Sequence, residues 1–289
     1  MRIVSSDISR PTVTASLPAG VATLGTSRLA AAGPQPTAAG TDPQQHHPRP
    51  TTVLIHGAFA DASSWQGVVE LLQAQGHQIL APALPLRGLA SDAAYIRSVL
   101  QSITGPIVLV GHSYGGSVIT QAAGGLSDVK ALVYIAAFVP DIGESALALT
   151  GKFPGSTLPQ ATSTQTYPLP GGEQGEELVI KQDLFHDQFA AGVPAQTARV
   201  MAAGQRPITL SALQEPAQEA AWKTIPSWYL VATEDRNIPP AAQQWMAQRA
   251  GAHTVSIRAP HAAAVTDPGA VTDLIRRAIR STTEWHAPL

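Results

Sequence analysis

The sequence predicts an α/β fold in which a mainly parallel central sheet carries helices on both faces. From residue 51 onward, short apolar segments alternate with amphipathic segments of helical period. Most of the apolar segments are continuous runs, which is typical of strands buried on both faces of a parallel sheet. Alternating strands and helices of this kind indicate parallel strands joined by helical connections.

Six strands are expected, at residues 51–56, 78–83, 106–111, 131–138, 227–232 and 253–258. Helices are expected between them, because apolar side chains recur there at i, i+3, i+4 and i+7. The three clearest stripes are Trp65, Val68, Val69 and Leu72, then Ile96, Val99, Leu100 and Ile103, and finally Val271, Leu274, Ile275 and Ala278. Asp267 as N-cap and Pro268 at the first helical position mark the start of the last helix.

One long interval, between Phe138 and Ser227, interrupts the alternation. Its first part, GKFPGSTLPQATSTQTYPLPGG, is predicted to be loop-like, and helical stretches are expected around residues 178–191 and 194–203. An insertion of this length is usually a lid or cap over a site. We therefore expect a small helical cap over about residues 140–225, with a peripheral insertion of no function as the alternative.

The first 50 residues are rich in Ala, Pro, Thr, Gln and Gly and are expected to be a disordered tail preceding a domain at 51–289. Residues 8–36 resemble a bacterial twin-arginine export signal with an A-x-A-like end at Ala30–Ala32. However, Pro11 follows Arg10 where a second arginine belongs, and Pro18 interrupts the apolar part. The tail is thus either a degenerate signal or plain disordered chain, and the location stays open between the cytoplasm and export to the periplasm or medium.

Composition excludes several classes of function. Charged residues make up 13% and the net charge is −2. A chain with this charge lacks the excess of basic residues that binding to nucleic acid or to an anionic membrane requires. No apolar run approaches the ~20 residues that span a bilayer. Cysteine is absent, and neither metal-ligand spacing nor a phosphate or dinucleotide motif occurs, so no metal and no cofactor is expected. The oligomeric state stays open, with a homodimer as one alternative.

The stretch VGHSYGG, Val110–Gly116, follows a predicted strand and contains the pattern G-x-S-x-G. Gly111 and Gly115 lack the Cβ atoms that would collide when a strand reverses sharply into a helix. Ser113 would then stand at the apex of the turn as a nucleophile. The alternative is a structural serine in a glycine-rich turn.

An acid and a histidine follow two later strands, in TEDRNIPP and APHAAAVTDP. Loops after parallel strands lie at the same edge of a sheet, so both can reach Ser113. The chain order Ser, Asp, His is one that hydrolytic triads use. We expect Ser113 to attack an acyl carbon, His261 to act as base, and Asp235 to orient the imidazole, with Glu234 as the alternative acid.

Backbone N–H donors must face the oxyanion of such a reaction. One is expected from Tyr114, the residue after the nucleophile, and one from the early segment HGAFADASSW, where Ala58 is the first candidate and Phe59 the second. Phe59 and Phe138 are also expected to line the substrate pocket. Phe185 and Phe189 are further candidates for the pocket, but a position in an ordinary core explains them equally well.

Over residues 51 to about 280 the sequence resembles the α/β-hydrolase superfamily, and within it the cofactor-free group of bacterial esterases, plant methylesterases and hydroxynitrile lyases. The resemblance rests on VLIHGAFADASSW, VLVGHSYGG, ALVYIAAFVPD, WYLVATEDRNIPP and the histidine of APHAAAVTDP. It implies the α/β-hydrolase fold with a small cap, the triad Ser113, Asp235 and His261, and oxyanion donors from Ala58 and Tyr114.

The function expected from these features is hydrolysis of a small to medium, apolar carboxylic ester by a serine esterase, through an acyl-enzyme. The small-molecule ester is the one partner expected. One alternative is a hydroxynitrile lyase, although the lyases that resemble this chain carry Thr in place of Gly57 and Lys in place of Ala262. Another is a non-catalytic ligand receptor on the same fold, against which the sequence offers no discriminator. Dehalogenases and epoxide hydrolases are disfavoured, because they carry Asp where this chain has Ser113.

Overall fold

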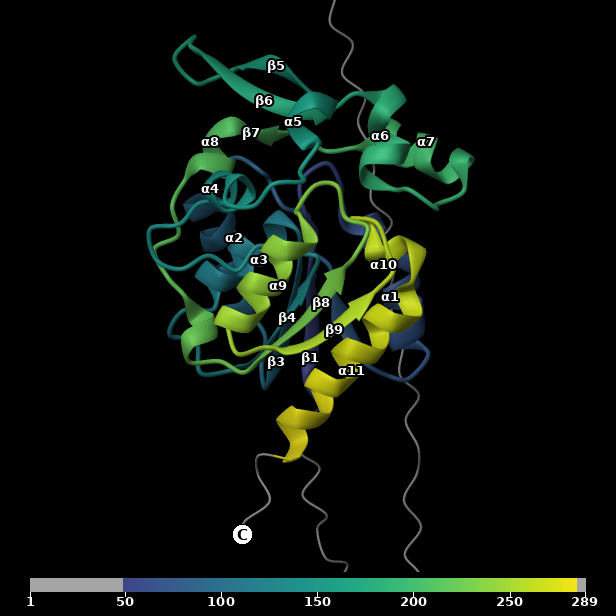
Figure 1. Ribbon diagram of the computed structural model, residues 1–289. Coiled ribbons are helices and arrows are strands. Elements are labelled where there is room, and N and C mark those ends of the chain that lie inside the picture. Colours follow the sequence, from purple (N-terminus) through teal and green to yellow (C-terminus); the bar gives the residue numbers. More distant parts are fainter. Residues whose placement is uncertain (1–48, 285–289) are drawn as a thin grey trace, which may run out of the picture. The chain divides into compact units, whose positions relative to one another are not determined.

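A six-stranded parallel sheet forms the centre of the computed structural model, which describes residues 49–284 (Figure 1). The strand order is β2-β1-β3-β4-β8-β9, and every neighbouring pair is parallel. The strands are β1 (Thr51–Ile55), β2 (Gln78–Leu80), β3 (Ile107–His112), β4 (Val129–Ile135), β8 (Ser227–Ala232) and β9 (His253–Ile257). The predicted parallel sheet is confirmed, although β2 is shorter than expected and β4 ends at Ile135 rather than at Phe138.

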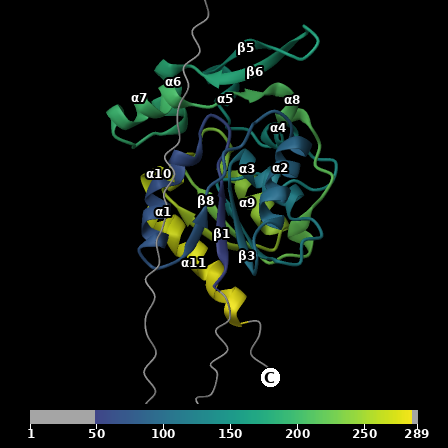
Figure 2. The ribbon, with the colours of Figure 1, turned by 180° about the vertical axis from the view of Figure 1, so that it is seen from behind.

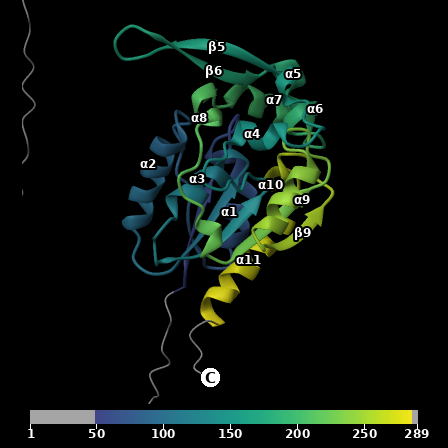
Figure 3. The same cartoon turned by 60° about the vertical axis from the view of Figure 1, so that its left-hand side comes forward.

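Helices cover both faces of this sheet, as predicted. On one face lie α1 (Gln66–Gln73) and α11 (Pro268–Glu284), which pack against each other (Figure 2). On the other face lie α2 (Leu89–Gln101), α3 (Tyr114–Ala122) and α9 (Pro240–Arg249), with α2 beside α3 (Figure 3). Side chains alternate between the two cores: Leu54 joins the α1 and α11 side, whereas Val53 and Ile55 join the other.

The segment between β4 and β8 lies over the edge where the strands end (Figure 1). It comprises α4 (Ala146–Gly151), α5 (Leu158–Ala161), β5 (Thr162–Pro168), β6 (Gln174–Ile180), α6 (Gln182–Phe189), α7 (Ala195–Gly204), β7 (Ile208–Thr209), α8 (Leu210–Gln214) and the 3-10 turn η2 (Ala221–Lys223). We refer to residues 136–226 as the cap. It is not purely helical, because β5, β6 and β7 form an antiparallel sheet.

The hairpin of β5 and β6 corrects two expectations about the cap. The segment expected to be a loop contains strand β5, and Leu178, expected in a helix, belongs to strand β6. The Pro and Gly residues that indicated a loop serve mainly the hairpin turn, where Gly171 and Gly172 have φ of 100° and 91°. Thr-rich alternation in β5 is a strand pattern that this glycine-rich composition concealed. The helix expected at residues 194–203 is present as α7.

Two further findings concern the described part of the chain. No helix within residues 49–284 is long and apolar enough to cross a membrane. In the same residues, no group of three or more His, Cys, Asp or Glu side chains could hold a metal ion. Residues 1–48 of the predicted tail, including the stretch that resembles an export signal, lie outside the described residues.

Candidate active site

The turn between β3 and α3 carries Ser113 in an unusual backbone conformation. Its φ of 54° and ψ of −124° are strained for a residue with a side chain, at a cost of about 1–3 kcal/mol. Three backbone hydrogen bonds hold it there: Ser113 N–H donates to Ile135 O, and Gly116 and Phe138 N–H donate to Ser113 O. Strain maintained in this way is a feature of functional turns.

Four positions around this turn have room only for glycine, among them Gly116, where a Cβ would meet Phe138 O. A Cβ at Gly111 would lie 2.6 Å from Gly115 O, and one at Gly115 would lie 2.6 Å from Ile55 O. At Gly57, a Cβ would lie 2.6 Å from the Cβ of Ser113. Because real Cβ atoms essentially never approach within 3.0 Å, any side chain at these positions would displace the turn.

His261 and Asp235 reach Ser113 from the loops after β9 and β8. His261 Nε2 lies 2.8 Å from Ser113 Oγ, and His261 Nδ1 lies 2.7 Å from Asp235 Oδ2. All three residues are buried, with 6% of Ser113, 1% of His261 and 4% of Asp235 exposed. A carboxylate can only accept, so Nδ1–H donates to Asp235 and Nε2 is left to accept the hydroxyl proton of Ser113. A hydroxyl, a base and an acid that orients the base are thus in one hydrogen-bonded chain.

Asp235 is itself held by three more donors. Its Oδ1 accepts from the N–H groups of Asn237 at 2.7 Å and Ile238 at 3.0 Å, and its Oδ2 accepts from Gln243 Nε2 at 2.7 Å. Gln243 is fully buried, and its Oε1 accepts from Ala232 N–H at 3.0 Å. This network fixes the carboxylate relative to the end of β8.

The neighbours of Asp235 differ in how far the sequence identifies them. Glu234, the alternative acid, lies outside the cluster, where its carboxylate accepts from Arg258 Nε at 2.6 Å on the surface. Gln243 escapes motif analysis because a glutamine on a helix belongs to no catalytic pattern. Its one signal is helical spacing, which places it with Ala242 and Met246 among the buried residues of α9.

Two other buried histidines support the backbone around the site. His112 donates Nε2–H to His261 O at 2.9 Å, and burial, followed by the neighbouring His261, lowers the pKa of His112 well below its usual range. His56 accepts Leu84 N–H at Nε2 at 2.8 Å and donates Nδ1–H to Gly57 O at 2.9 Å. Burial also lowers the pKa of His56. Both rings are therefore neutral near pH 7 and serve as fixed hydrogen-bonding groups.

The expected oxyanion donors, Ala58 and Tyr114, are both buried. Within residues 49–284, neither backbone N–H donates a hydrogen bond. For Tyr114 this follows from its place as first residue of α3, where a helix leaves its N–H groups unpaired. Phe59, the second candidate, instead donates its N–H to Arg206 O of the cap at 3.1 Å. Two N–H groups close to Ser113 in the chain or in space are thus available to a ligand.

Helix α6 of the cap covers His261 with an aromatic ring. The ring centre of Phe189 lies 5.1 Å from that of His261, edge to face, and Ala262 N–H donates to Phe189 O at 3.0 Å. Phe185 stacks against Phe189 with ring centres 5.0 Å apart. Phe138, which the sequence places in the pocket, is buried and uses its N–H to hold Ser113. Phe189 is the aromatic residue at the site that the sequence did not distinguish from ordinary core.

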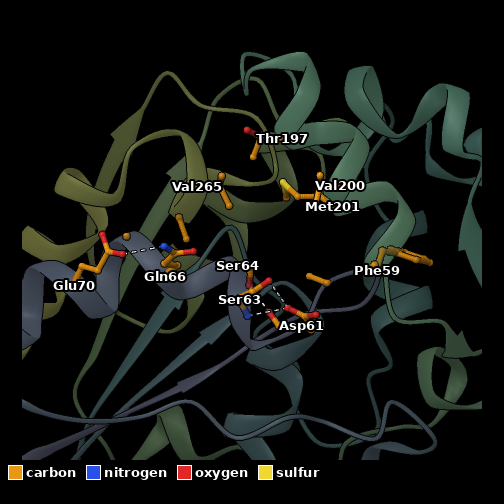
Figure 4. A pocket seen from close by; sticks show the side chains of 14 residues that line it. Phe59, Asp61, Ser63, Ser64, Gln66, Glu70, Thr197, Val200, Met201 and Val265 are labelled. Atoms are coloured by element: carbon orange, nitrogen blue, oxygen red, sulfur yellow. Dashed lines mark hydrogen bonds between the residues drawn. The ribbon is translucent and has the colours of Figure 1, made fainter.

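A cavity of about 430 Å³ opens between α7 and the core segment formed by the 3-10 turn η1 (Ala62–Trp65) and α1 (Figure 4). Its α7 side is lined by Val200 and Met201 as well as by Thr197, whereas Asp61 lies on the core side. Phe59 lines it, but Phe138 and Ser113 do not. The cavity therefore flanks the early loop rather than the hydroxyl of Ser113.

Comparison with known proteins relates this geometry to one family. The model of the Alpha/beta hydrolase family matches residues 52–274. Among curated proteins, Alpha/beta hydrolase nvfD of Aspergillus novofumigatus is 26% identical over 80% of this chain and 96% of its own length. Methylesterase 2 of Arabidopsis thaliana is 27% identical over 67% of this chain and 81% of its own.

A solved structure has the same fold. The crystal structure of polyneuridine aldehyde esterase superposes with a TM-score of 0.70 at 20% identity, covering 80% of this chain and 99% of that one. The family match spans the sheet, the cap and all three residues of the Ser113 cluster. The chain therefore belongs to the alpha/beta hydrolase family, and its parallel sheet with helices on both faces is the fold of that family.

Proposed function

We propose that this protein is a serine carboxylic ester hydrolase that works through an acyl-enzyme. The observation that carries the proposal is the unbroken chain from Ser113 Oγ through the His261 ring to Asp235, with contacts of 2.8 and 2.7 Å. Family membership and the esterases among its relatives support ester hydrolysis in general. The roles of the individual residues are inferred from their chemistry.

In the first half of the reaction, Ser113 Oγ bonds to the ester carbonyl carbon while His261 Nε2 takes the hydroxyl proton. The carbonyl oxygen becomes an oxyanion and accepts hydrogen bonds from the N–H groups of Ala58 and Tyr114. When the carbonyl reforms, the bond to the alcohol oxygen breaks, and His261 Nε2–H protonates that oxygen. The products of this half are a free alcohol and an acyl group on Ser113.

In the second half, water replaces the alcohol. His261 Nε2 takes a proton from water as its oxygen bonds to the acyl carbon, and the same two N–H groups bind the second oxyanion. Collapse breaks the bond to Ser113 Oγ, which recovers its proton from His261, and the carboxylic acid leaves. Asp235 stays ionised throughout and stabilises the cationic form of His261.

The substrate we propose is a small to medium ester with apolar groups. Phe189 packs on His261, and Phe59 and Phe138 belong to the buried apolar core, which favours an uncharged ligand. Several relatives carry the name methylesterase, which favours a small alcohol group in the ester. A lyase is disfavoured, because this chain has Gly57 where the resembling lyases carry a threonine. A Cβ at Gly57 would lie 2.6 Å from the Ser113 Cβ, so the turn has no room for that side chain.

For the chain as a whole, we propose a single hydrolase domain over residues 51–289, in which the segment predicted at about residues 140–225 covers the active site. Support comes from the contact of Phe189 with His261, which brings the cap over the proposed base. Removal of such a cap would expose the base to water, and water competes for the hydrogen bonds of an active site.

The test is the steady-state hydrolysis of p-nitrophenyl esters from acetate to decanoate by the full chain. The variants Ser113→Ala and His261→Ala are expected to lose at least about 10³-fold in kcat. Ser117→Ala is the matched control, because Ser117 is a buried serine of α3 whose hydroxyl has no partner within residues 49–284. It should keep wild-type kcat.

Turnover that survives in Ser113→Ala would overturn the proposal. Absence of turnover in folded wild-type protein across the series, together with tight binding of an ester or acid, would instead favour a ligand receptor. Release of cyanide from mandelonitrile at an enzymatic rate would favour the lyase.

A further inference from the structure

Asp92 is a fully buried carboxylate that the proposed mechanism leaves without a role. It lies in the first turn of α2 with none of its surface exposed. No basic side chain within residues 49–284 forms an ion pair with it. Burial raises the pKa of Asp92, and hydrogen bonds from Tyr114 and from backbone N–H groups partly offset that effect. A carboxylate is costly at such a position unless its hydrogen bonds are well made.

The principal partner of Asp92 is the side chain of Tyr114. Tyr114 O–H donates to Asp92 Oδ2 at 3.0 Å, across the contact between α2 and α3. Burial, followed by the charge of Asp92, raises the pKa of Tyr114, so its hydroxyl stays a donor throughout the working pH range. Tyr114 also supplies one of the proposed oxyanion donors through its backbone N–H. The hydrogen bond to the Tyr114 hydroxyl therefore restrains the residue whose backbone N–H is proposed to face the oxyanion.

The other proposed oxyanion donor, Ala58 N–H, is held in place by the loop that precedes α2. The loop Leu84–Gly88, between β2 and α2, donates Leu84 N–H to His56 Nε2, and His56 Nδ1–H donates to Gly57 O. Gly57 C=O and Ala58 N–H belong to one planar trans peptide and point in opposite directions. Holding the carbonyl oxygen of Gly57 therefore also sets the direction of Ala58 N–H.

The loop Leu84–Gly88 contacts Asp92 and the cap as well. Arg87 N–H lies 3.4 Å from Asp92 Oδ1, and the Arg87 side chain pairs with Glu177 of β6. Leu86, at a φ of 60°, accepts Thr209 N–H of the cap at 3.1 Å. Asp92 thus links the nucleophile turn, through the Tyr114 hydroxyl, to the loop at residues 84–88, through Arg87 N–H.

We propose that Asp92 is a positioning residue for ester hydrolysis, which holds the nucleophile turn through the Tyr114 hydroxyl so that Tyr114 N–H faces the developing oxyanion. The proposal rests on the proposed function, since it assigns Asp92 a part in the same reaction. Its effect falls on the transition state, where the oxyanion exists, and not on binding of the uncharged ester.

The first test is Tyr114→Phe, which keeps the ring and removes the bond to Asp92. The kcat for p-nitrophenyl butyrate, per titrated active site, should fall about 10-fold, because a displaced donor stabilises the oxyanion less. KM should stay within about 2-fold of wild type. A trifluoromethyl ketone forms a tetrahedral adduct with an oxyanion on the active serine, so its inhibition constant should rise by the same factor as kcat falls.

Variants at Asp92 and a second tyrosine complete the test. Asp92→Asn keeps an oxygen that accepts the Tyr114 hydroxyl and should retain most of the activity, whereas Asp92→Ala should match Tyr114→Phe. Tyr134→Phe is the matched control, because the buried Tyr134 hydroxyl bonds to Thr120 Oγ1 at 2.9 Å in the same core. It should lower the melting temperature and leave kcat and inhibitor affinity unchanged.

Two outcomes would overturn the assignment of Asp92. In one, Tyr114→Phe keeps wild-type kcat and inhibitor affinity, which would make the bond to Asp92 merely structural. In the other, Tyr134→Phe loses as much kcat as Tyr114→Phe, which would make the effect a general one of the core. If Asp92→Ala does not fold, Tyr114→Phe decides alone. Failure of the proposed function is distinct, since wild-type protein would then neither turn over esters nor form the ketone adduct.

Discussion

The sheet edge that carries Ser113 and the cap above it are held in place by different means. At the sheet edge, short backbone contacts leave no room for a side chain at Gly57, Gly111 or Gly115, and Asp235 is fully hydrogen-bonded. The cap meets the core partly through separate polar contacts: Phe59 N–H to Arg206 O, Thr209 N–H to Leu86 O, Ala262 N–H to Phe189 O, and the pair of Arg87 with Glu177. On the proposed function, we expect the sheet edge to set the chemistry and the cap to set which ester reaches it.

The largest expected effect is at the acid of the sheet edge. Asp235→Asn should reduce kcat by about 10⁴-fold, because an amide no longer favours the tautomer of His261 that accepts a proton at Nε2. Glu234→Gln is the matched control, since Glu234 pairs with Arg258 on the surface. Steady-state kinetics of both variants measure the difference. A large loss in Glu234→Gln with a small one in Asp235→Asn would reverse the assignment of the acid.

Glycine substitutions extend the comparison to stability. Gly111→Ala should destabilise the protein by about 3 kcal/mol, because its Cβ would meet Gly115 O at 2.6 Å. Gly151→Ala, in cap helix α4, meets nothing within 4 Å and should be neutral or slightly stabilising, as alanine favours a helix over glycine. Urea denaturation measures both values. Equal stability of the two variants would contradict the claim that the sheet edge is the more tightly determined region.

A cap substitution is expected to act mainly on substrate binding. Phe189→Leu keeps most of the apolar volume and removes the ring edge from His261, so KM for longer p-nitrophenyl esters should change about 3- to 10-fold with a smaller change in kcat. Leu184→Ala, an exposed position on the same helix, is the control and should leave both constants unchanged. A loss in kcat with unchanged KM would place Phe189 with the chemistry instead.

The smallest expected effect is a pH dependence of stability that comes from the buried carboxyl of Asp92. Burial raises the pKa of Asp92 above its usual 3.8, so the native state holds this proton more tightly than the unfolded chain does. The resulting stabilisation is complete below the unfolded pKa and is lost as the pH rises through the raised folded pKa. Asp92→Asn does not titrate, so the melting temperature of wild type should fall relative to this variant as the pH rises from 4 to 8. A constant difference between them would contradict the raised pKa.

The sequence predicted the sheet edge better than the cap for a physical reason. The turn at Ser113 is determined by nearby glycines, and the loops of Asp235 and His261 follow apolar strands, so neighbouring residues carry the information. The hairpin of β5 and β6 depends on pairing across a turn rich in Pro and Gly, and its polar strands lack the apolar run of a buried strand. Gln243 could not be identified because no local pattern shows that it bonds to Asp235, and the same holds for Asp92, whose partner Tyr114 lies on another helix.

The most direct test of the proposed chemistry is covalent labelling of the nucleophile. Full-length protein is treated with diisopropyl fluorophosphate, and its intact mass and peptide map are measured beside those of Ser113→Ala and Ser117→Ala. We expect one adduct per chain on the peptide that contains Ser113 in wild type and in Ser117→Ala, and none in Ser113→Ala. An unlabelled but folded wild-type protein, or an adduct that persists in Ser113→Ala, would contradict the assignment of Ser113 as the activated nucleophile.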